Sequence, residues 1–361
     1  MAKIEEAVAI GIGVQTAQAS VNEAVRDATD LHTAAATATT ATGILLRNNA
    51  DLAQTLTRQE SDGGVAPGSL SRVSGALLRV DPSFSFTIDA MGSRGEASDP
   101  LDAGDFNLPE YMKRIFAGAR LVQQTPTAAT TEYEFAATSA GAYHTLKIWR
   151  GAGANSESWV LVGCTFNLTF NFEAGQKATI TVDVVADSVD YYGTTVTFPP
   201  ASVTTAYGEQ EKSAPILESA ANALDTVTRG FQSATLAISY PVNVTGDCNA
   251  TGGSLKSQGT PRLVSFEASY FADTGDDDYD LLTADLDGDD TGPAVSFRLG
   301  AVAGAGDTVN ALTVLIPNFR VLDNGKEDGD SVMRRITGYA AIAGDSEFGS
   351  LINQELRLAC V

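Results

Sequence analysis

Positions 158–187, SWVLVGCTFNLTFNFEAGQKATITVDVVAD, contain the pattern that most constrains the fold of this chain. Apolar and polar side chains alternate along two runs, and Glu173 to Gln176 supply a turn between them. Alternation with a period of two is typical of a half-buried β-strand. The runs therefore predict an antiparallel ribbon with one apolar face and one polar face. The predicted polar face carries Thr165, Asn167, Thr169, Asn171, Thr179, Thr181 and Asp183.

The rest of the composition also favours β-structure. The chain has 361 residues, of which 43% are hydrophobic, and 34 of them are glycine. This length allows a buried core and is a prior for two domains. Short segments rich in Val, Thr and Phe, separated by turn residues, predict a mainly β chain.

The chain is strongly acidic, with a formal net charge of −22 and a pI of about 4.3. Stable binding to nucleic acid depends on many Lys and Arg contacts to phosphates, so this charge argues against it. An acidic surface instead suits a protein that touches DNA without retaining it, because like charges repel.

The cysteines and the N-terminus predict synthesis in a cytoplasm without export. Cys164, Cys248 and Cys360 match no zinc or redox spacing, and we expect them to be reduced. The first residues, MAKIEEAVAIGIGV, are acidic where a signal peptide is basic. No later segment approaches the length of a membrane span, so no membrane partner is expected.

An internal repeat follows from the order of predicted elements. Each half gives a strand, a long loop with Gly-Ser-Leu, a strand with Ser-Phe, a helix, further strands and a closing ribbon; the second ribbon spans 312–342. The sequence therefore predicts two tandem β domains, each with a flanking short helix. We expect an N-terminal arm at 1–43, the first domain at 44–187, a linker at 188–230 and the second domain at 231–361.

Several local features carry their own predictions. The segment 108–118, LPEYMKRIFAG, predicts a helix that starts near Pro109, stops at Gly118 and buries Tyr111 and Ile115. A strand is expected at 234–244 and a short helix near 216–224. His32 and His144 are both expected at the surface, because neither has a metal partner nearby.

Two long loops, at 59–74 and 245–261, interrupt the predicted strands. Loops of this length are usually functional or disordered. They and their flanks hold basic residues in an otherwise acidic chain, so contact with an acidic neighbouring copy is an alternative to simple solvation. The candidate contact residues are Arg58, Ser69, Arg72, Ser254, Lys256 and Arg262.

No catalytic, cofactor or metal motif is present in the sequence. The segment 273–290 is rich in aspartate, but its order does not fit an EF-hand, and a solvated acidic face at a helix N-terminus explains it better than a metal site. Ile10 to Gly13 lacks the third glycine of a dinucleotide loop. We therefore expect no enzyme activity, cofactor or metal, although paired carboxylates of a β-sandwich hydrolase could still converge in space.

Taken together, four segments resemble the major tail tube proteins of long-tailed bacteriophages. They are VAIGIGVQTAQASVN, LTRQESDGGVAPGSLSRVSGALLRVDPSFSFTID, LPEYMKRIFAG and CTFNLTFNFEAGQKATITVDVV. The resemblance covers most of the chain and rests on the arrangement of elements; the long N-terminal arm and the linker depart from it. It implies β-sandwich or barrel domains with flanking helices, which form rings that stack into a tube.

The resemblance also implies a function. The chain is expected to be a structural virion protein of the tail, assembled in the host cytoplasm, whose acidic tube conducts the genome at ejection. The partners would be copies of itself, in a trimeric pseudo-hexameric ring or a hexamer, other tail proteins, and double-stranded DNA in transient passage. The polar rows of 158–187 would line the lumen, and the two long loops would reach the next ring. A β-sandwich module that binds glycans or acts as an adhesin is the alternative.

Overall fold

The computed structural model describes part of the chain, and everything below concerns that part. The described residues are 8–14, 42–44, 53–60, 77–90, 95–96, 110–123, 133–137, 144–150, 157–173, 176, 178–186, 188–192, 223–224, 227–228, 231–246, 254–258, 262–271, 293–299, 308–309, 312–327, 333–342 and 355–360.

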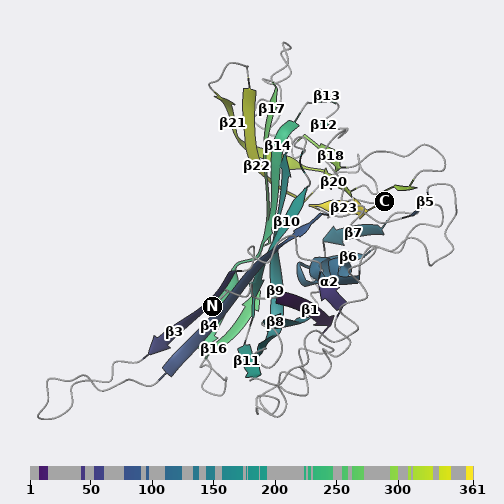
Figure 1. The fold of residues 1–361 in the computed structure, drawn as a ribbon. Coiled ribbons are helices and arrows are strands. Elements are labelled where there is room, and N and C mark those ends of the chain that lie inside the picture. Colours follow the sequence, from purple (N-terminus) through teal and green to yellow (C-terminus); the bar gives the residue numbers. More distant parts are fainter. Residues whose placement is uncertain are drawn as a thin grey trace, which may run out of the picture.

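The described residues form a mainly β protein with antiparallel strand pairing (Figure 1). The first half of the chain contributes β1 (Val8–Val14), β2 (Thr42–Ile44), β3 (Ala53–Glu60), β4 (Leu77–Asp89), β5 (Gly95–Glu96), α2 (Glu110–Gly118), β6 (Leu121–Gln123), β7 (Tyr133–Ala137), β8 (His144–Arg150), β9 (Glu157–Glu173), β10 (Thr179–Val185) and β11 (Ser188–Tyr192). The second half contributes β12 (Ala223–Leu224), β13 (Val227–Thr228), β14 (Phe231–Ser239), β15 (Val242–Gly246), β16 (Ser254–Gln258), β17 (Leu263–Phe271), β18 (Val295–Leu299), β19 (Thr308–Val309), β20 (Leu312–Ile316), β21 (Phe319–Glu327), β22 (Met333–Ala340) and β23 (Arg357–Cys360).

The predicted ribbon is present as β9 and β10, and β9 is the branch point of the largest sheet. Its N-terminal part pairs with β8 and β11, while its C-terminal part pairs with β10 and β14. The register shifts opposite the point where β9 changes partners, and Gly163 there has a φ of 68°. A positive φ suits glycine, so this residue allows one long strand to serve two groups of neighbours.

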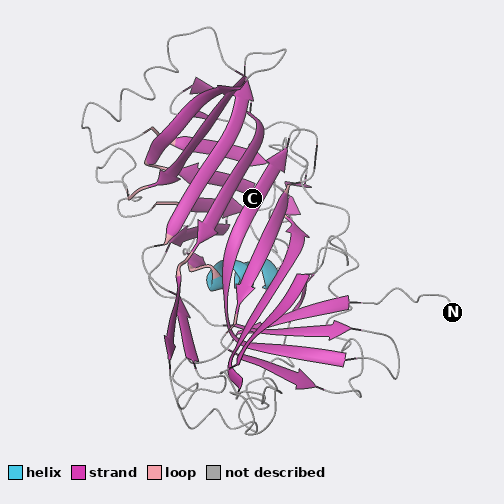
Figure 2. Ribbon diagram, turned by 90° about the vertical axis from the view of Figure 1, so that its left-hand side faces the viewer, coloured by secondary structure: helices cyan, strands magenta, loops and turns pink. Residues whose placement is uncertain are grey.

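The apolar rows of the ribbon lie in a core that runs through both halves of the chain. Phe172 of β9 meets Phe297 of β18 edge to face, with ring centroids 4.8 Å apart. Phe297 in turn stacks on Phe266 of β17 at 5.7 Å, and Phe266 contacts Phe319 of β21. These contacts pack the 12-stranded sheet that holds β9 against a 7-stranded sheet that holds β18. Figure 2 shows the strands of two layers crossing in its upper part.

The same order of strand pairing occurs in each half. In the first half the order is β3-β4-β10-β9 in one group and β2-β1-β8-β9-β11 in the other. In the second half it is β14-β17-β22-β21 and β13-β12-β18-β20-β23. The single long strand β9 belongs to both groups of the first half. In the second half the equivalent positions belong to two strands, β20 and β21, which are separated by Pro317 and Asn318. The halves are joined by sheet pairing, because β9 pairs with β14 and β7 pairs with β23.

Helix α2 confirms the helix predicted at 108–118 and its buried face. Tyr111 and Ile115 are fully buried, and the Arg114 guanidinium donates to the Ile12 carbonyl at 2.6 Å. The helix ends at Gly118, as predicted, and this residue also has a packing role. A Cβ at this position would lie 2.2 Å from the Phe166 ring, and the residue with a left-handed φ is Arg120, at 56°. Gly118 therefore lets the helix approach β9 closely.

Four local predictions were wrong. The strand expected at 234–244 is divided, because Pro241 lacks the N–H that a continuing strand would use, and the loop expected at 245–261 contains β16. His144 is fully buried, since it lies on the inward face of β8 with Leu146, and its ring centroid is 5.6 Å from that of Phe166. Ala223 and Leu224 are in a strand that pairs with β18, which excludes them from the helix expected near 216–224.

Other predictions fall outside the described residues, among them most of the N-terminal arm, the acidic segment 273–290 and its helix, and the positions of Ser69 and Arg72. No helix within the described segments is long and apolar enough to cross a membrane.

Candidate functional site

The outward face of the 12-stranded sheet is a continuous polar surface, and it is the candidate functional site. Strand register places Thr87, Thr181, Thr169, Ala237, Ser265, Tyr339 and Arg320 in one row from β4 to β21. The next row holds Asp89, Thr179, Asn171, Thr235, Glu267, Thr337 and Asp323. Because successive side chains alternate across a sheet, both rows lie on the face opposite the core.

Hydroxyl and amide groups dominate this surface. The Thr87 and Thr181 hydroxyls lie 3.4 Å apart and link β4 to β10. Arg335 forms an ion pair of 2.6 Å with Glu267, so its charge is locally balanced. Among the described residues of β4, β9 and β10, the outward positions from Ser83 to Asp89, from Thr165 to Glu173 and from Thr179 to Val185 include no Lys or Arg. The surface can exchange hydrogen bonds with water but has few cations with which to hold phosphate.

The structure brings the predicted lumen residues together, although with unequal exposure. Asn171 and Asp183 are exposed, and Asn167, Thr169 and Thr181 are partly exposed. Thr165 and Thr179 are largely covered, with 8% and 7% of their surface accessible. The Thr165 hydroxyl donates to the Val185 carbonyl, where β9 leaves one group of strands for the other. These two threonines therefore support the ribbon more than they extend the polar surface.

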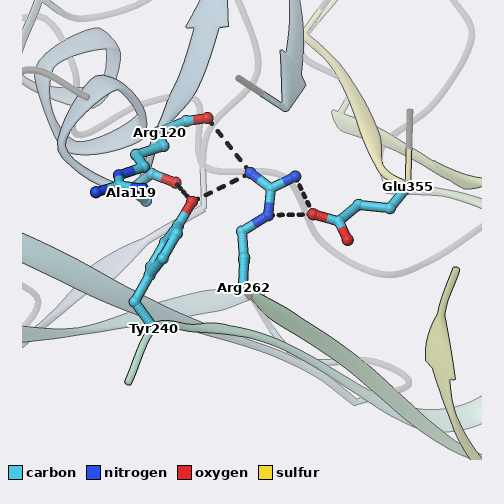
Figure 3. A network of polar contacts seen from close by, with 5 residues as sticks. All are labelled: Ala119, Arg120, Tyr240, Arg262 and Glu355. Carbon is cyan, nitrogen blue, oxygen red and sulfur yellow. Dashed lines mark hydrogen bonds and ion pairs between the residues drawn. The ribbon is translucent and has the colours of Figure 1, made fainter. Parts of the chain in front are cut away.

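A largely buried polar network connects the two halves of the chain (Figure 3). The Tyr240 hydroxyl donates to the Ala119 carbonyl at 2.8 Å, just after helix α2. Arg262 forms an ion pair with Glu355 and donates to the Tyr240 hydroxyl at 3.1 Å and to the Arg120 carbonyl at 3.3 Å. The side chains of Arg262 and Glu355 are only 9% and 16% exposed. The network thus joins the end of α2, the β14–β17 pair and the residue leading into β23.

Tyr240 lies between two cations in this network. The guanidinium carbons of Arg120 and Arg262 are 5.1 Å and 5.9 Å from the centre of its ring. Burial disfavours the phenolate and raises the pKa of Tyr240 above its ordinary value, although the nearby Arg262 acts in the opposite direction. Tyr240 therefore stays a neutral hydrogen-bond donor over the physiological range.

The predicted loop residues are dispersed. Arg58 lies in β3 opposite Val80, while Ser254 and Lys256 lie in β16 opposite Gly246 and Val244. Arg262 is held inside the chain by Glu355 and Tyr240, which leaves its side chain little exposed.

Sequence reasoning missed the second-half members of the polar surface and the network. The second-half members of the polar surface were detectable in the sequence, because apolar and polar residues alternate in SATLAIS and VSFEASY as they do in the ribbon. The network was not detectable in the sequence, since Arg262 and Glu355 are 93 positions apart.

No protein-family model matches the sequence, and no curated protein matches it either. Within the described residues, no group of three or more His, Cys, Asp or Glu side chains is placed to hold a metal ion.

Proposed function

We propose that this chain is the structural subunit of a bacteriophage tail tube, which assembles into stacked rings and forms the conduit for the genome. The observation that carries the proposal is the polar surface that continues without interruption from β4 to β21. A catalytic cleft is concave and gathers acids, bases or a metal. A broad sheet face of hydroxyls and amides, such as the Thr87 and Thr181 row, suits the inner wall of a tube.

The repeated pairing order supports tandem tail-tube-like domains. Each chain contains two units of the same strand topology, which pair through β9 and β14. Each unit would form one segment of the tube wall. Three chains then satisfy a pseudo-six-fold ring, which we favour over a ring of six chains. Closing such a ring also protects strand edges that would otherwise pair without control.

The charge supports passage of DNA without retention. The chain has a net charge of −22, and Arg335 of the polar surface is paired with Glu267. Double-stranded DNA would find few uncompensated cations on such a wall, so contacts would stay transient. The role is structural and not catalytic.

Assembly places the subunit in the virion tail after synthesis in the host cytoplasm, where it would meet other tail proteins. The β3–β4 pair and the β15–β16 hairpin are the elements that we propose to contact the next ring. Arg58 on β3, with Ser254 and Lys256 on β16, would offer polar and basic groups to an acidic neighbour. Among the described residues β15 and β16 form a sheet of two strands, and such a pair is only marginally stable in water, which favours a partner for it.

Electron microscopy of the purified full-length chain, together with light scattering, tests the proposal. We expect rings or tubes with a central channel, formed by the chain alone or after addition of other tail proteins. A protein that stays monomeric at high concentration under both conditions would contradict it. Binding of that monomer to a glycan array would instead support the adhesin alternative.

A further inference from the structure

The chain contains its own example of how one repeat unit joins the next. At the end of the first unit, β9 pairs antiparallel with β14, the first strand of the second unit's equivalent group. Thr169 lies opposite Ala237, and Leu168 lies opposite Ile238. The Asn167 side chain extends the join, because its Oδ1 atom accepts a hydrogen bond from the Tyr240 backbone nitrogen at 3.1 Å.

The strands equivalent to β9 and β14 at the two ends of the sheet have open edges. Within the described part of the chain, β21 pairs only with β22, and β3 pairs only with β4. Leu322 lies at the register shift in β21 and is 71% exposed. An open strand edge presents unpaired backbone N–H and C=O groups, which are a template for pairing with another strand.

Strand register relates the positions of the two units to each other. Ser85 and Ser265 occupy equivalent places, because they precede the equivalent Phe86 and Phe266 of β4 and β17. Ala53 lies opposite Ser85 and Ala237 lies opposite Ser265, so β3 from Ala53 matches β14 from Ala237.

The same reasoning relates β9 to β21. Asp183 of β10 and Tyr339 of β22 lie opposite Ser85 and Ser265, respectively. Across the next pair of strands, Asn167 lies opposite Asp183 and Arg320 lies opposite Tyr339. Arg320 is therefore the β21 equivalent of Asn167, and Val321 is the equivalent of Leu168.

From these equivalences we infer that β21 pairs with β3 of a second copy of this chain, in the register of the β9–β14 join. Arg320 then lies opposite Thr55 of the neighbour, and Val321 lies opposite its Gln54. The inference rests on the proposed function and specifies the contact by which chains close a ring. Since each chain adds two units to the wall, a pseudo-six-fold ring closes with three chains.

The pairing of β21 with β3 of a second copy lacks the polar network that stabilises the β9–β14 pairing within the chain. By the same register, Leu56 and Pro82 hold the positions of Tyr240 and Arg262. Neither side chain can donate the hydrogen bonds that Tyr240 and Arg262 make to Ala119 and Arg120. The ring therefore has two kinds of strand pairing between units, one within a chain and one between chains.

Disulfide crosslinking of the full-length chain tests this pairing. Directly opposed strand residues have Cα atoms about 4.5 to 5.5 Å apart, which suits a disulfide. The background carries Cys248→Ser and Cys360→Ser and keeps the buried Cys164. The test pair is Arg320→Cys with Thr55→Cys, and the matched control, Arg320→Cys with Thr57→Cys, keeps the same face but shifts the register. Thr169→Cys with Ala237→Cys reports folding, because these residues are opposed within one chain.

After oxidation of the assembled protein, we expect the test pair to give covalent products of two and three chains and nothing larger. The control pair should stay mostly uncrosslinked. Rings visible by electron microscopy with equal or absent crosslinking in the two pairs would overturn the register and leave the proposed function standing. Covalent products of up to six chains would overturn closure with three. A folded chain that forms neither rings nor crosslinks, both alone and with other tail proteins added, would overturn both proposals.

Discussion

The Oδ1 atom of Asn167 accepts a 3.1 Å hydrogen bond from the backbone nitrogen of Tyr240. Asn167 belongs to the polar rows of the first half, and Tyr240 belongs to the buried network of the second. The contact therefore links the polar rows of β9 to the network at the point where β14 ends.

Removing Arg262 should destabilise the folded chain. An Arg262→Met variant leaves the Glu355 carboxylate with little solvent, and breaking a buried ion pair in this way costs about 3 to 5 kcal/mol. The double variant Arg262→Met, Glu355→Leu should recover much of this loss, because no charge is left unpaired. Urea unfolding of the two variants measures the difference. A single variant as stable as the unaltered chain would contradict the role given to the network.

Tyr240 should make stability fall at high pH. Its pKa is raised in the folded chain, so the folded state holds the phenolic proton more tightly than the unfolded state does. This contribution is complete below the unfolded pKa of about 10 and is lost as pH rises through the higher folded pKa. A Tyr240→Phe variant lacks the titrating group, so its free energy of unfolding should fall less between pH 9 and pH 11. Parallel pH dependence in the two proteins would count against the prediction.

Gly118→Ala should destabilise the contact between α2 and β9. The added Cβ would lie 2.2 Å and 2.6 Å from atoms of the Phe166 ring, and such overpacking usually costs about 1 to 3 kcal/mol. Gly325→Ala is the matched control, since the nearest atom to its Cβ would be 3.8 Å away. Thermal unfolding of both variants measures the effect. Adding Phe166→Leu to Gly118→Ala should restore part of the loss, and an absence of any rescue would place the strain elsewhere.

Leu322→Lys should weaken assembly and leave folding unchanged. The side chain is 71% exposed in the single chain, so substitution removes little packing there, while a lysine on an edge strand discourages pairing. Leu263→Lys is the control, because Leu263 is also exposed but lies on β17, which has β14 and β22 on its two sides. Sedimentation should show smaller assemblies only for Leu322→Lys. Equal assembly of both variants would argue against an interface at β21.

Local alternation was enough to predict many strands and the β9–β10 ribbon, but not the pairing of strands that are distant in the sequence. The Phe and Thr positions of 158–187 predicted β9 and β10 with their faces, and Pro109 with the apolar Tyr111 and Ile115 predicted α2. The pairing of β9 with β14 depends on contacts between distant segments, which periodicity does not encode.

The errors have different physical causes. The burial of His144 follows from its position on β8 relative to Phe166, where tertiary packing overrides the preference of histidine for the surface. The break between β14 and β15 has a local signal, because Pro241 lacks the N–H that a continuing strand would use.

The orientation of the polar surface in an assembled ring is the most direct test of this account. A reconstruction by electron cryomicroscopy of tubes formed by the full-length chain would locate the row that contains Thr181, Thr169 and Ser265. We predict that this row faces the central channel, with three chains in each ring. A ring in which the row faces outward, or is buried between rings, would contradict the central claim.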